Sequence, residues 1–327
     1  MAVSDSIQAQ AAAIVAGDRR ALARAITLIE STRPNHRVQA EQLISDLMPH
    51  TGTSIRIGIS GVPGVGKSTF IEAFGLHLIE RGHKVSVLAV DPSSPRTGGS
   101  ILGDKTRMEL LSRNQGAFIR PSPSSGTLGG VARRTREAML ACEAAGFDIV
   151  LVETVGVGQS ETAVADLVDL FLLLIAPAGG DELQGIKKGI VELADLIVVN
   201  KADGDLLPAA ERAGRDYSAA LHLLRSASAN WQPKVHLCSS VQGSGIEDIW
   251  TSIEAFTTIK TSTGDFTRRR QSQATAWMWN EVHETLNAEL KAAPEVAAMI
   301  PELDKQVRSG KATPTEAARL ILKAFKN

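Results

Sequence analysis

The segment Gly61–Ser68 constrains this chain more than any other feature, because it fits the pattern G-x-x-x-x-G-K-S. An apolar run that predicts a strand, Ile55–Ser60, precedes it, and a helical stretch, Thr69–Arg81, follows it. Glycines in such a loop let backbone N–H groups turn inward around phosphate oxygens, and the start of the helix adds positive charge. The alternative, a glycine-rich turn that ends in Lys-Ser by chance, is disfavoured by the two flanking elements.

We therefore predict that this loop binds a nucleoside triphosphate. Lys67 is expected to reach the β- and γ-phosphates, and the hydroxyl of Ser68 is expected to ligate Mg²⁺. The expected phosphate-binding residues are Gly61, Val62, Pro63, Gly64, Val65, Gly66, Lys67, Ser68 and Thr69.

Apolar runs alternate with helical stretches from about residue 55 to residue 258. Several runs are apolar at consecutive positions, which is typical of strands buried on both faces. This alternation predicts right-handed βαβ units, and so an α/β fold with a mostly parallel P-loop NTPase sheet flanked by helices. The expected strands are Ile55–Ser60, Val85–Val90, Ala117–Arg120, Ile149–Glu153, Leu170–Ile175, Leu196–Asn200 and Val235–Cys238.

Both ends of the chain show helical spacing and no strand signal. We expect an N-terminal helical extension at residues 1–50, the α/β domain at 51–262 and a C-terminal helical arm at 263–327. The run Arg268–Arg270 within this arm is interpreted as a solvated, charged surface.

Apolar residues recur at helical spacing in the C-terminal arm, at Trp279, Val282, Leu286 and Leu290. Packing on the chain's own core is the usual arrangement for such a stripe. A dimer seam is the alternative, and the spacing does not decide between the two.

The charges nearly cancel, since 35 Lys and Arg against 36 Asp and Glu leave a net charge of −1. No global positive field therefore draws the chain to nucleic acid or anionic lipid. The longest apolar run, Leu170–Ala178, is far shorter than the ~20 residues of a membrane-spanning helix. The N-terminus has no basic lead-in to an apolar stretch, and Cys142 and Cys238 are isolated in apolar surroundings. We expect no secretory signal, structural thiols and a cytoplasmic protein.

A second motif, Asn200-Lys201-Ala202-Asp203, follows an apolar run and indicates which base is bound. The carboxylate of Asp203 can accept hydrogen bonds from guanine N1–H and from the exocyclic amine, whereas adenine would leave it unpaired. Lys201 is expected to lie along the base plane, and Asn200 to tie this loop to the phosphate loop. A polar strand end leading into a helix cap is the alternative interpretation.

The segment that follows the last expected strand supports guanine. Ser239, Ser240 and Val241, followed by Gly243-Ser244-Gly245-Ile246, resemble the loop that closes over guanine in GTPases. We therefore expect GTP and GDP as ligands in preference to ATP.

The segment Glu153-Thr154-Val155-Gly156 resembles the D-x-x-G motif, with Glu in place of Asp. A carboxylate at this strand end can hold Mg²⁺, and the N–H of Gly156 can meet the γ-phosphate. Val157 stands where Ras-like proteins carry the glutamine that orients water, so we expect slow intrinsic hydrolysis.

Two further carboxylates lie in a loop rich in Pro, Ser and Gly. Asp91 ends an expected strand and Asp104 follows, and strand carboxyl ends are where open α/β sheets bind ligands. Both are candidates for the Mg²⁺ site. A solvated loop with incidental charges is the alternative.

These motifs, with the segments Asp91–Arg107, Pro121–Arg134 and Gly180–Lys188, resemble the MeaB/ArgK-type P-loop GTPases over nearly the whole chain. The resemblance implies a GTPase that serves as a chaperone of adenosylcobalamin-dependent methylmalonyl-CoA mutase, gates cofactor delivery and protects the mutase from inactivation. It also implies a homodimer joined through the C-terminal arm. The implied catalytic residues are Lys67, Glu153, Asp91 and Asp104, and the implied Mg²⁺ neighbourhood is Ser68, Asp91, Asp104 and Glu153.

The same resemblance implies a mobile loop that responds to the mutase and contains Asp181, Gln184 and Lys187. From their pattern alone, these polar residues can equally decorate the cap of a helix that begins near Ile186.

Two rival functions share this fold. A metallochaperone for nickel or zinc needs clustered soft or imidazole ligands, whereas the seven histidines here are scattered and the two cysteines are isolated. A small-molecule kinase would transfer the γ-phosphate to a substrate, but kinases of this fold seldom need a guanine-reading loop. The absence of a D-x-H-x-x-G motif indicates that the chain does not ligate cobalamin itself.

Overall fold

A computed structural model describes residues 2–90, 108–121, 128–154, 160–177, 188–223 and 230–326. These residues form two compact units, residues 1–273 and residues 274–327. The expected three-part division at 50/51 and 262/263 stays a prediction, because compact packing alone does not define the parts that fold independently.

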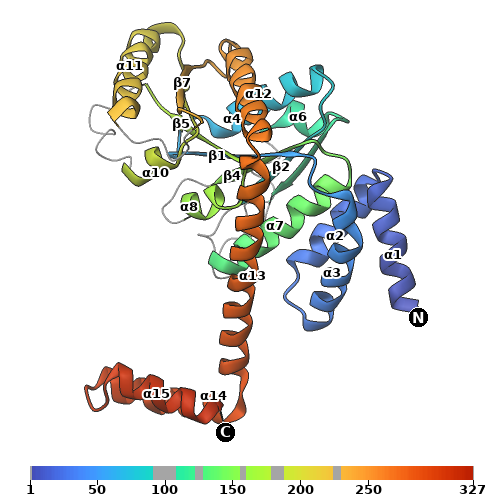
Figure 1. The fold of residues 1–327 in the computed structure, drawn as a ribbon, viewed down its shortest axis with the longest axis vertical. Helices are drawn as coiled ribbons and strands as arrows, with labels where there is room; N and C mark the ends of the chain where they lie inside the picture. The colour runs from blue at the N-terminus through green and yellow to red at the C-terminus, as the bar shows by residue number, and fades with distance from the viewer. Residues whose placement is uncertain are drawn as a thin grey trace. The chain divides into compact units, whose positions relative to one another are not determined.

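The first unit is built on a seven-stranded sheet of parallel strands in the order β3-β2-β4-β1-β5-β6-β7 (Figure 1). The expected parallel α/β sheet is therefore confirmed, and each expected strand lies within one residue of an observed one. Most strand residues are buried, as consecutive apolar positions indicate. The strands are β1 (Ile55–Gly61), β2 (Val85–Val90), β3 (Ala117–Pro121), β4 (Ile149–Thr154), β5 (Leu170–Ile175), β6 (Leu196–Val199) and β7 (Lys234–Leu237).

Strand β1 lies in the middle of the sheet, between β4 and β5. The chain adds β2, β3 and β4 on one side of β1 before it crosses to add β5, β6 and β7 on the other. Parallel sheets bind ligands outside the carboxyl ends of the strands, where the winding direction reverses. This topology directs attention to the loop after β1.

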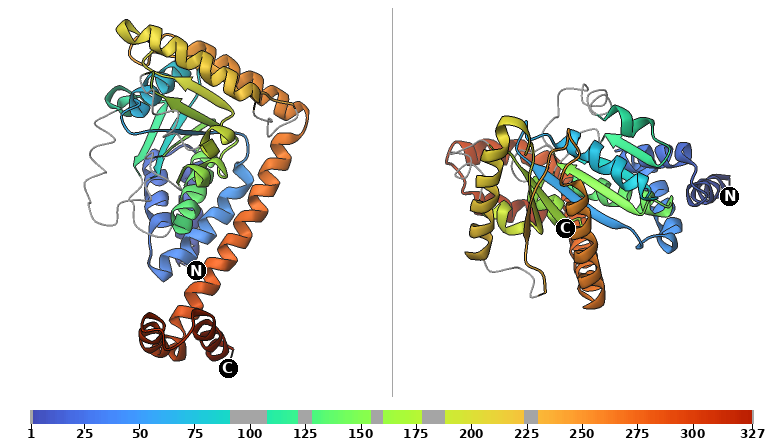
Figure 2. Two further views of the ribbon diagram at one scale, coloured as in Figure 1. Left: turned by 90° about the vertical axis from the view of Figure 1, so that its left-hand side faces the viewer. Right: turned by 90° about the horizontal axis from the view of Figure 1, so that it is seen from above.

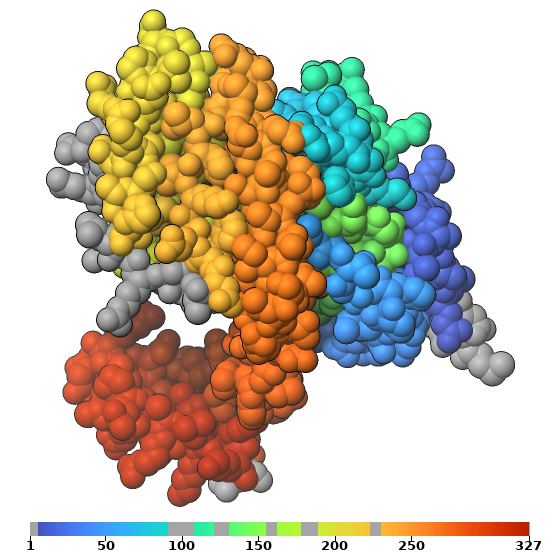
Figure 3. Space-filling view, turned by 45° about the horizontal axis from the view of Figure 1, so that its top comes forward, coloured from blue at the N-terminus to red at the C-terminus, as the bar shows by residue number. Residues whose placement is uncertain are grey.

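One face of the sheet is covered by α4 (Lys67–Glu80) and α12 (Ile246–Ser262), which also contact each other. Ile57, Ile59 and Leu151 point to this face and join a buried cluster with Phe70 and Trp250. Figure 3 shows α12 beside the cyan surface of α4. The short helix α6 (Glu109–Arg113) packs against α4 and β3.

The opposite face is covered by helices that follow β3 to β6, so the sheet lies between two helical layers (Figure 2). Val150 and Val152 of β4 are fully buried on this side. These helices are α7 (Leu128–Ala144), α8 (Ser160–Ala165), α10 (Lys188–Leu193) and α11 (Leu207–Leu223). The described residues also form two single 3-10 turns, η1 (Met48–His50) and η2 (Gly204–Leu206).

The N-terminal helices belong to the first unit, where α2 and α3 pack against α7 (Figure 3). They are α1 (Ala2–Val15), α2 (Arg19–Glu30) and α3 (Pro34–Leu47). Asp18 caps α2 by accepting hydrogen bonds from two backbone N–H groups. Arg120 at the end of β3 pairs with Glu30, and Arg19 donates to the carbonyl of Ala117. These contacts tie α2 to the outer strand of the sheet.

The interpretation of Arg268–Arg270 as a solvated run is wrong for Arg270. Its guanidinium donates to both oxygens of Asp169, with Nε–Oδ1 at 2.8 Å and Nη2–Oδ2 at 2.6 Å, and to the carbonyls of Gly52 and Ser54 at 2.6 Å. Arg268, in contrast, has 65% of its side chain exposed. Arg268 and Arg270 differ in exposure because only one side of the first turns of α13 (Asp265–Ala292) faces the amino ends of the strands.

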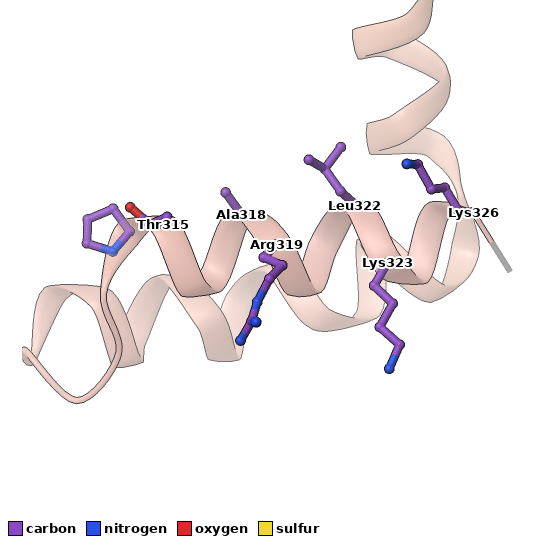
Figure 4. A pocket seen from close by; sticks show the side chains of 7 residues that line it. Thr315, Ala318, Arg319, Leu322, Lys323 and Lys326 are labelled. Atoms are coloured by element: carbon purple, nitrogen blue, oxygen red, sulfur yellow. The ribbon is translucent and has the colours of Figure 1, made fainter.

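The second unit contains α13 from Ala274 onward, with α14 (Pro294–Arg308) and α15 (Pro314–Phe325). Val296, Leu303 and Ala317 are buried where α14 packs against α15. The other side of α15 borders a hollow of about 980 Å³ (Figure 4), lined by Pro314, Thr315, Ala318, Arg319, Leu322, Lys323 and Lys326. None of the helices in the described ranges is long and apolar enough to cross a membrane.

Candidate nucleotide-binding site

The loop after β1 folds tightly because two of its glycines occupy positions closed to other residues. A Cβ at Gly61 would lie 2.5 Å from the carbonyl oxygen of Leu174. Gly66 caps α4 in the left-handed region with φ of 94°, and a Cβ there would lie 2.8 Å from Nδ2 of Asn200. The loop can therefore approach neighbouring strand ends closely, and its amides lead directly into the helix N-terminus.

Lys67 is the first residue of α4, and its side chain folds back over the loop. Its Nζ donates to the carbonyl of Gly61 at 2.7 Å and to the carbonyl of Val62 at 3.3 Å. Lys67 is 9% exposed. The ammonium group is thus held beside the loop amides, where it adds positive charge to an anion-binding concavity. Ser68 and Thr69 follow in the first turn of the helix.

Glu153, near the carboxyl end of β4, lies beside the start of α4. The hydroxyl of Ser68 donates to Oε1 of Glu153 at 3.4 Å, although the two residues are 85 positions apart. Glu153 is 8% exposed. A carboxylate and a hydroxyl side by side are the hard oxygen donors that Mg²⁺ prefers.

Asn200 joins the loop after β6 to the phosphate loop, in the way that the sequence predicts. Its Nδ2 donates to the carbonyl of Val65 at 2.9 Å, and Asn200 is 1% exposed. Its Oδ1 accepts hydrogen bonds from the N–H of Ser240 at 3.3 Å and from the Ser240 hydroxyl at 2.7 Å. One amide side chain therefore connects three loops at the carboxyl edge of the sheet.

Lys201 adds a second tie, since its Nζ donates to the carbonyl of Gly64 at 2.8 Å. Its φ of +60° makes it the one non-glycine residue with positive φ in the described parts of the chain. Residues other than Gly adopt this region at a cost of about 1–3 kcal/mol, and such strain is concentrated at functional sites. This conformation places Asp203 two residues further on, beside the loop after β7.

Asp203 is held by Ser239, whose hydroxyl donates to Oδ2 of the carboxylate. The Ser239 hydroxyl also accepts a hydrogen bond from the N–H of Gln242 at 3.1 Å. Val241, at the tip of this loop, is 83% exposed. The arrangement leaves a fixed carboxylate and an uncovered apolar side chain beside the phosphate loop, which suits a planar base with two adjacent donors.

The two cysteines are buried and unpaired in the described structure. Burial raises the pKa of the Cys142 thiol and of the Cys238 thiol to about 12. Neither is therefore a thiolate near neutral pH, as expected of structural thiols.

Several expected site residues lie outside the described ranges, so the structure does not place them. They are Asp91, Asp104, Gly156, Asp181, Gln184 and Lys187. Among the residues that are described, no group of three or more His, Cys, Asp and Glu side chains is arranged to hold a metal ion.

A pair of hydroxyls lies beneath the site and is not among the residues predicted from the sequence. Oγ1 of Thr154 donates to Oγ of Ser60 at 2.9 Å, and both residues are fully buried. The signal available in the sequence was a hydroxyl residue at the carboxyl end of each of two otherwise apolar strands.

Comparisons with known proteins indicate the family of this chain. Residues 22–295 match the family model described as methylmalonyl-CoA mutase-associated GTPase MeaB. GTPase ArgK of Escherichia coli is 54% identical, over 82% of this chain and 81% of its own. The mouse protein named methylmalonic aciduria type A homolog, mitochondrial, is 51% identical, over 96% of this chain and 78% of its own.

A solved structure described as an LAO/AO transport system kinase superposes with a TM-score of 0.78 at 40% identity, and covers 99% of this chain and 98% of that one. The family match and the two relatives each span most of the chain and include both the phosphate loop and the Asn200–Asp203 loop. The chain therefore belongs to the MeaB family, and it is a P-loop GTPase.

Proposed function

We propose that this GTPase acts as a chaperone of adenosylcobalamin-dependent methylmalonyl-CoA mutase, gates delivery of the cofactor and protects the mutase from inactivation. The observation that carries the proposal is the family match over residues 22–295, whose description names association with this mutase. The name of the mouse relative refers to methylmalonic aciduria, which supports the same client.

The proposed ligands are GTP and GDP with Mg²⁺. Lys67 and the loop amides would bind the β- and γ-phosphates, while Asp203 would accept from guanine N1–H and the exocyclic amine. The hydroxyl of Ser68 and the carboxylate of Glu153 fit Mg²⁺, because they are adjacent hard oxygen donors on two elements. When bound, the ion neutralises charge that develops on the phosphate oxygens.

Asp91, Asp104 and Gly156 complete the proposed site from sequence alone, as do Asp181, Gln184 and Lys187 in the proposed mutase-responsive loop. Position 157 is Val, so this chain lacks a glutamine where Ras-like proteins orient the attacking water. Intrinsic hydrolysis is accordingly proposed to be slow and to depend on the mutase for acceleration.

GTP turnover measured with and without methylmalonyl-CoA mutase tests the proposal. We expect the mutase to accelerate phosphate release, and we expect the complex to be tighter with one nucleotide state than with the other. The Lys67→Ala variant is the matched control, because it should keep the fold and lose the acceleration. Equal turnover with and without the mutase, together with no complex, would remove the mutase as client and leave the GTPase in place.

A kinase reaction is the second candidate, because one similar solved structure is described as a transport system kinase. Hydrolysis and transfer differ in the group that attacks the γ-phosphorus. Stoichiometric release of inorganic phosphate from GTP with no added acceptor supports hydrolysis, whereas turnover that requires an acceptor supports a kinase.

A homodimer joined through the C-terminal arm is also proposed. Trp279 is 54% exposed, Val282 is 37% exposed and Leu286 is 50% exposed, so the stripe presents uncovered apolar side chains on α13. Exposed apolar stripes of this kind are typical of interfaces. Light scattering of the Trp279→Ala/Leu286→Ala variant should give a lower mass than wild type, with GTP affinity unchanged. The proposed compartment is the cytoplasm, which the two free thiols support.

A further inference from the structure

The hydrogen bond between Ser60 and Thr154 lies at a particular rung of the sheet. Backbone pairing between β1 and β4 ends with Ile59 opposite Glu153. Ser60 and Thr154 occupy the next rung, where β1 is about to enter the phosphate loop and β4 is about to end. Their side-chain bond of 2.9 Å therefore continues the connection between the two strands by one residue.

Side chains near this rung point to two different faces of the sheet. Successive residues of a strand point to opposite faces. Glu153 lies on the side of α4, where its Oε1 accepts from the hydroxyl of Ser68. Thr154 lies on the other side, which α8 covers. A bond that fixes the backbone at Thr154 consequently fixes the backbone from which the Glu153 side chain extends.

Apolar side chains would pack at these two positions without needing hydrogen-bond partners. Ser60 and Thr154 are both 0% exposed, among strands that are otherwise largely apolar. A buried hydroxyl left without a partner is unfavourable, so each of these residues depends on the other. Two adjacent strand ends thus carry a mutually dependent polar pair at the one place where the phosphate loop and the Glu153 segment separate.

We propose that Ser60 and Thr154 are positioning residues that hold the Glu153 carboxylate at the distance from Ser68 required to share a divalent cation with the phosphates of the nucleotide. This inference rests on the proposed Mg²⁺-dependent function. The pair contacts neither nucleotide nor cation, and it acts through the backbone of β4.

The test compares Thr154→Val, which removes the hydroxyl and keeps the shape, with Thr154→Ser, which keeps the hydroxyl. Two quantities are measured for each: the Mg²⁺ concentration that gives half-maximal GTP turnover, and the Kd of a non-hydrolysable GTP analogue with Mg²⁺ and with EDTA. A net hydrogen bond contributes about 0.5–1.5 kcal/mol, so Thr154→Val should need roughly threefold to tenfold more Mg²⁺. It should weaken analogue binding only when Mg²⁺ is present, and Thr154→Ser should restore both values.

Ser60→Ala provides a second route to the same result if Thr154→Val folds poorly, and it should shift the Mg²⁺ response in the same direction. The matched control is Ser86→Ala in β2. Ser86 is also fully buried and donates to the carbonyl of Ile149 at 3.5 Å, but it lies near the amino ends of the strands. Its removal should leave the Mg²⁺ response at the wild-type value.

The outcomes separate this inference from the function on which it rests. A wild-type protein that binds the analogue equally well with Mg²⁺ and with EDTA overturns the cation site, and with it any role for the pair. A wild-type response to Mg²⁺ that Thr154→Val and Ser60→Ala leave unchanged overturns the positioning role alone. A shift of equal size in Ser86→Ala also overturns it, since the effect would then belong to the sheet as a whole.

Discussion

The two ends of one parallel sheet contain polar networks of different kinds. At the carboxyl end, Lys67, Lys201 and Asn200 donate to loop carbonyls, and Val241 is uncovered. At the amino end, Glu143 accepts from Arg56 Nε at 2.6 Å, from the Ser54 hydroxyl at 2.5 Å and from the Gly52 N–H at 2.7 Å. The amino-end carboxylate is satisfied by the chain itself.

Polar residues at the amino end stabilise the fold, whereas those at the carboxyl end lie where a ligand is expected to bind. Arg56 is 5% exposed and Glu143 is 3% exposed, so removing either charge leaves the other buried. The carboxyl-end groups hold loops together through hydrogen bonds to backbone carbonyls and lie at the edge where ligands bind. Changes at the amino end should therefore alter stability and leave turnover intact, and changes at the carboxyl end should do the reverse.

The largest effect is expected from Glu143→Ala at the amino end. The variant leaves the Arg56 guanidinium buried without its carboxylate, and breaking such a pair costs about 3–5 kcal/mol of unfolding free energy. Chemical denaturation measures this loss, and kcat at a temperature where the variant is folded should match wild type. Glu247→Ala is the control, because Glu247 pairs with Arg81 while 53% of its side chain is exposed. An exposed pair contributes at most about 1 kcal/mol.

Lys67→Ala should produce the next largest effect, on turnover and not on stability. Without the ammonium group, charge on the β- and γ-phosphates is not neutralised, and kcat for GTP should fall by about 10²–10³-fold. The unfolding free energy should change little, because the Lys67 ammonium donates to carbonyls of its own loop at the edge of the sheet. A stable variant with wild-type turnover contradicts the assignment of Lys67 to the phosphate site.

Asp203→Asn separates two possible roles of Asp203 at the carboxyl end, recognition of the base and support of the loop. The amide keeps the shape of the carboxylate but replaces one acceptor with a donor that faces the guanine amine or N1–H. The preference for GTP over ATP should fall by about 1–3 kcal/mol, measured as the ratio of the two Kd values. An equal loss of affinity for both nucleotides would instead indicate that Asp203 only supports the loop.

The smallest effect concerns pH at the amino end. Burial alone would raise the pKa of Glu143, but the hydrogen bond and charge of Arg56, with Ser54 and the Gly52 amide, lower it below 4.5. The ionised carboxylate therefore contributes stability that is complete above pH 4.5 and is lost as the pH falls through the folded-state pKa.

Unfolding free energies of wild type and Glu143→Gln, measured from pH 7 to pH 3, test this dependence. The difference between them should be constant above pH 4.5 and should shrink below it. The comparison is needed because burial raises the pKa of Asp195, which gives total stability an opposing trend. A difference that stays constant down to pH 3 contradicts the lowered pKa of Glu143.

Sequence patterns predicted the carboxyl end far better than the amino end. The phosphate loop and Asn200–Asp203 are contiguous motifs, because each binds one part of a ligand with consecutive residues. Glu143, Asp169 and Arg270 come from three distant segments and meet only after the sheet and α13 have formed. Their spacing carries no signal, which is why Arg270 looked like part of a solvated run.

The Ser60–Thr154 pair was missed for a related reason. Both hydroxyls lie next to a recognised motif, but their connection depends on β1 and β4 being neighbours. Strand order was not predicted from the sequence, although the strands themselves were.

Calorimetric titration of the wild-type protein with GTP and with ATP, both in Mg²⁺, tests whether the site recognises guanine. We expect GTP to bind at one site per chain and ATP to bind at least about 100-fold more weakly, because the Asp203 carboxylate facing adenine would lack its two base donors. Equal affinity for the two nucleotides, or binding of neither, would contradict the claim that the loops after β1 and β6 form one guanine nucleotide site.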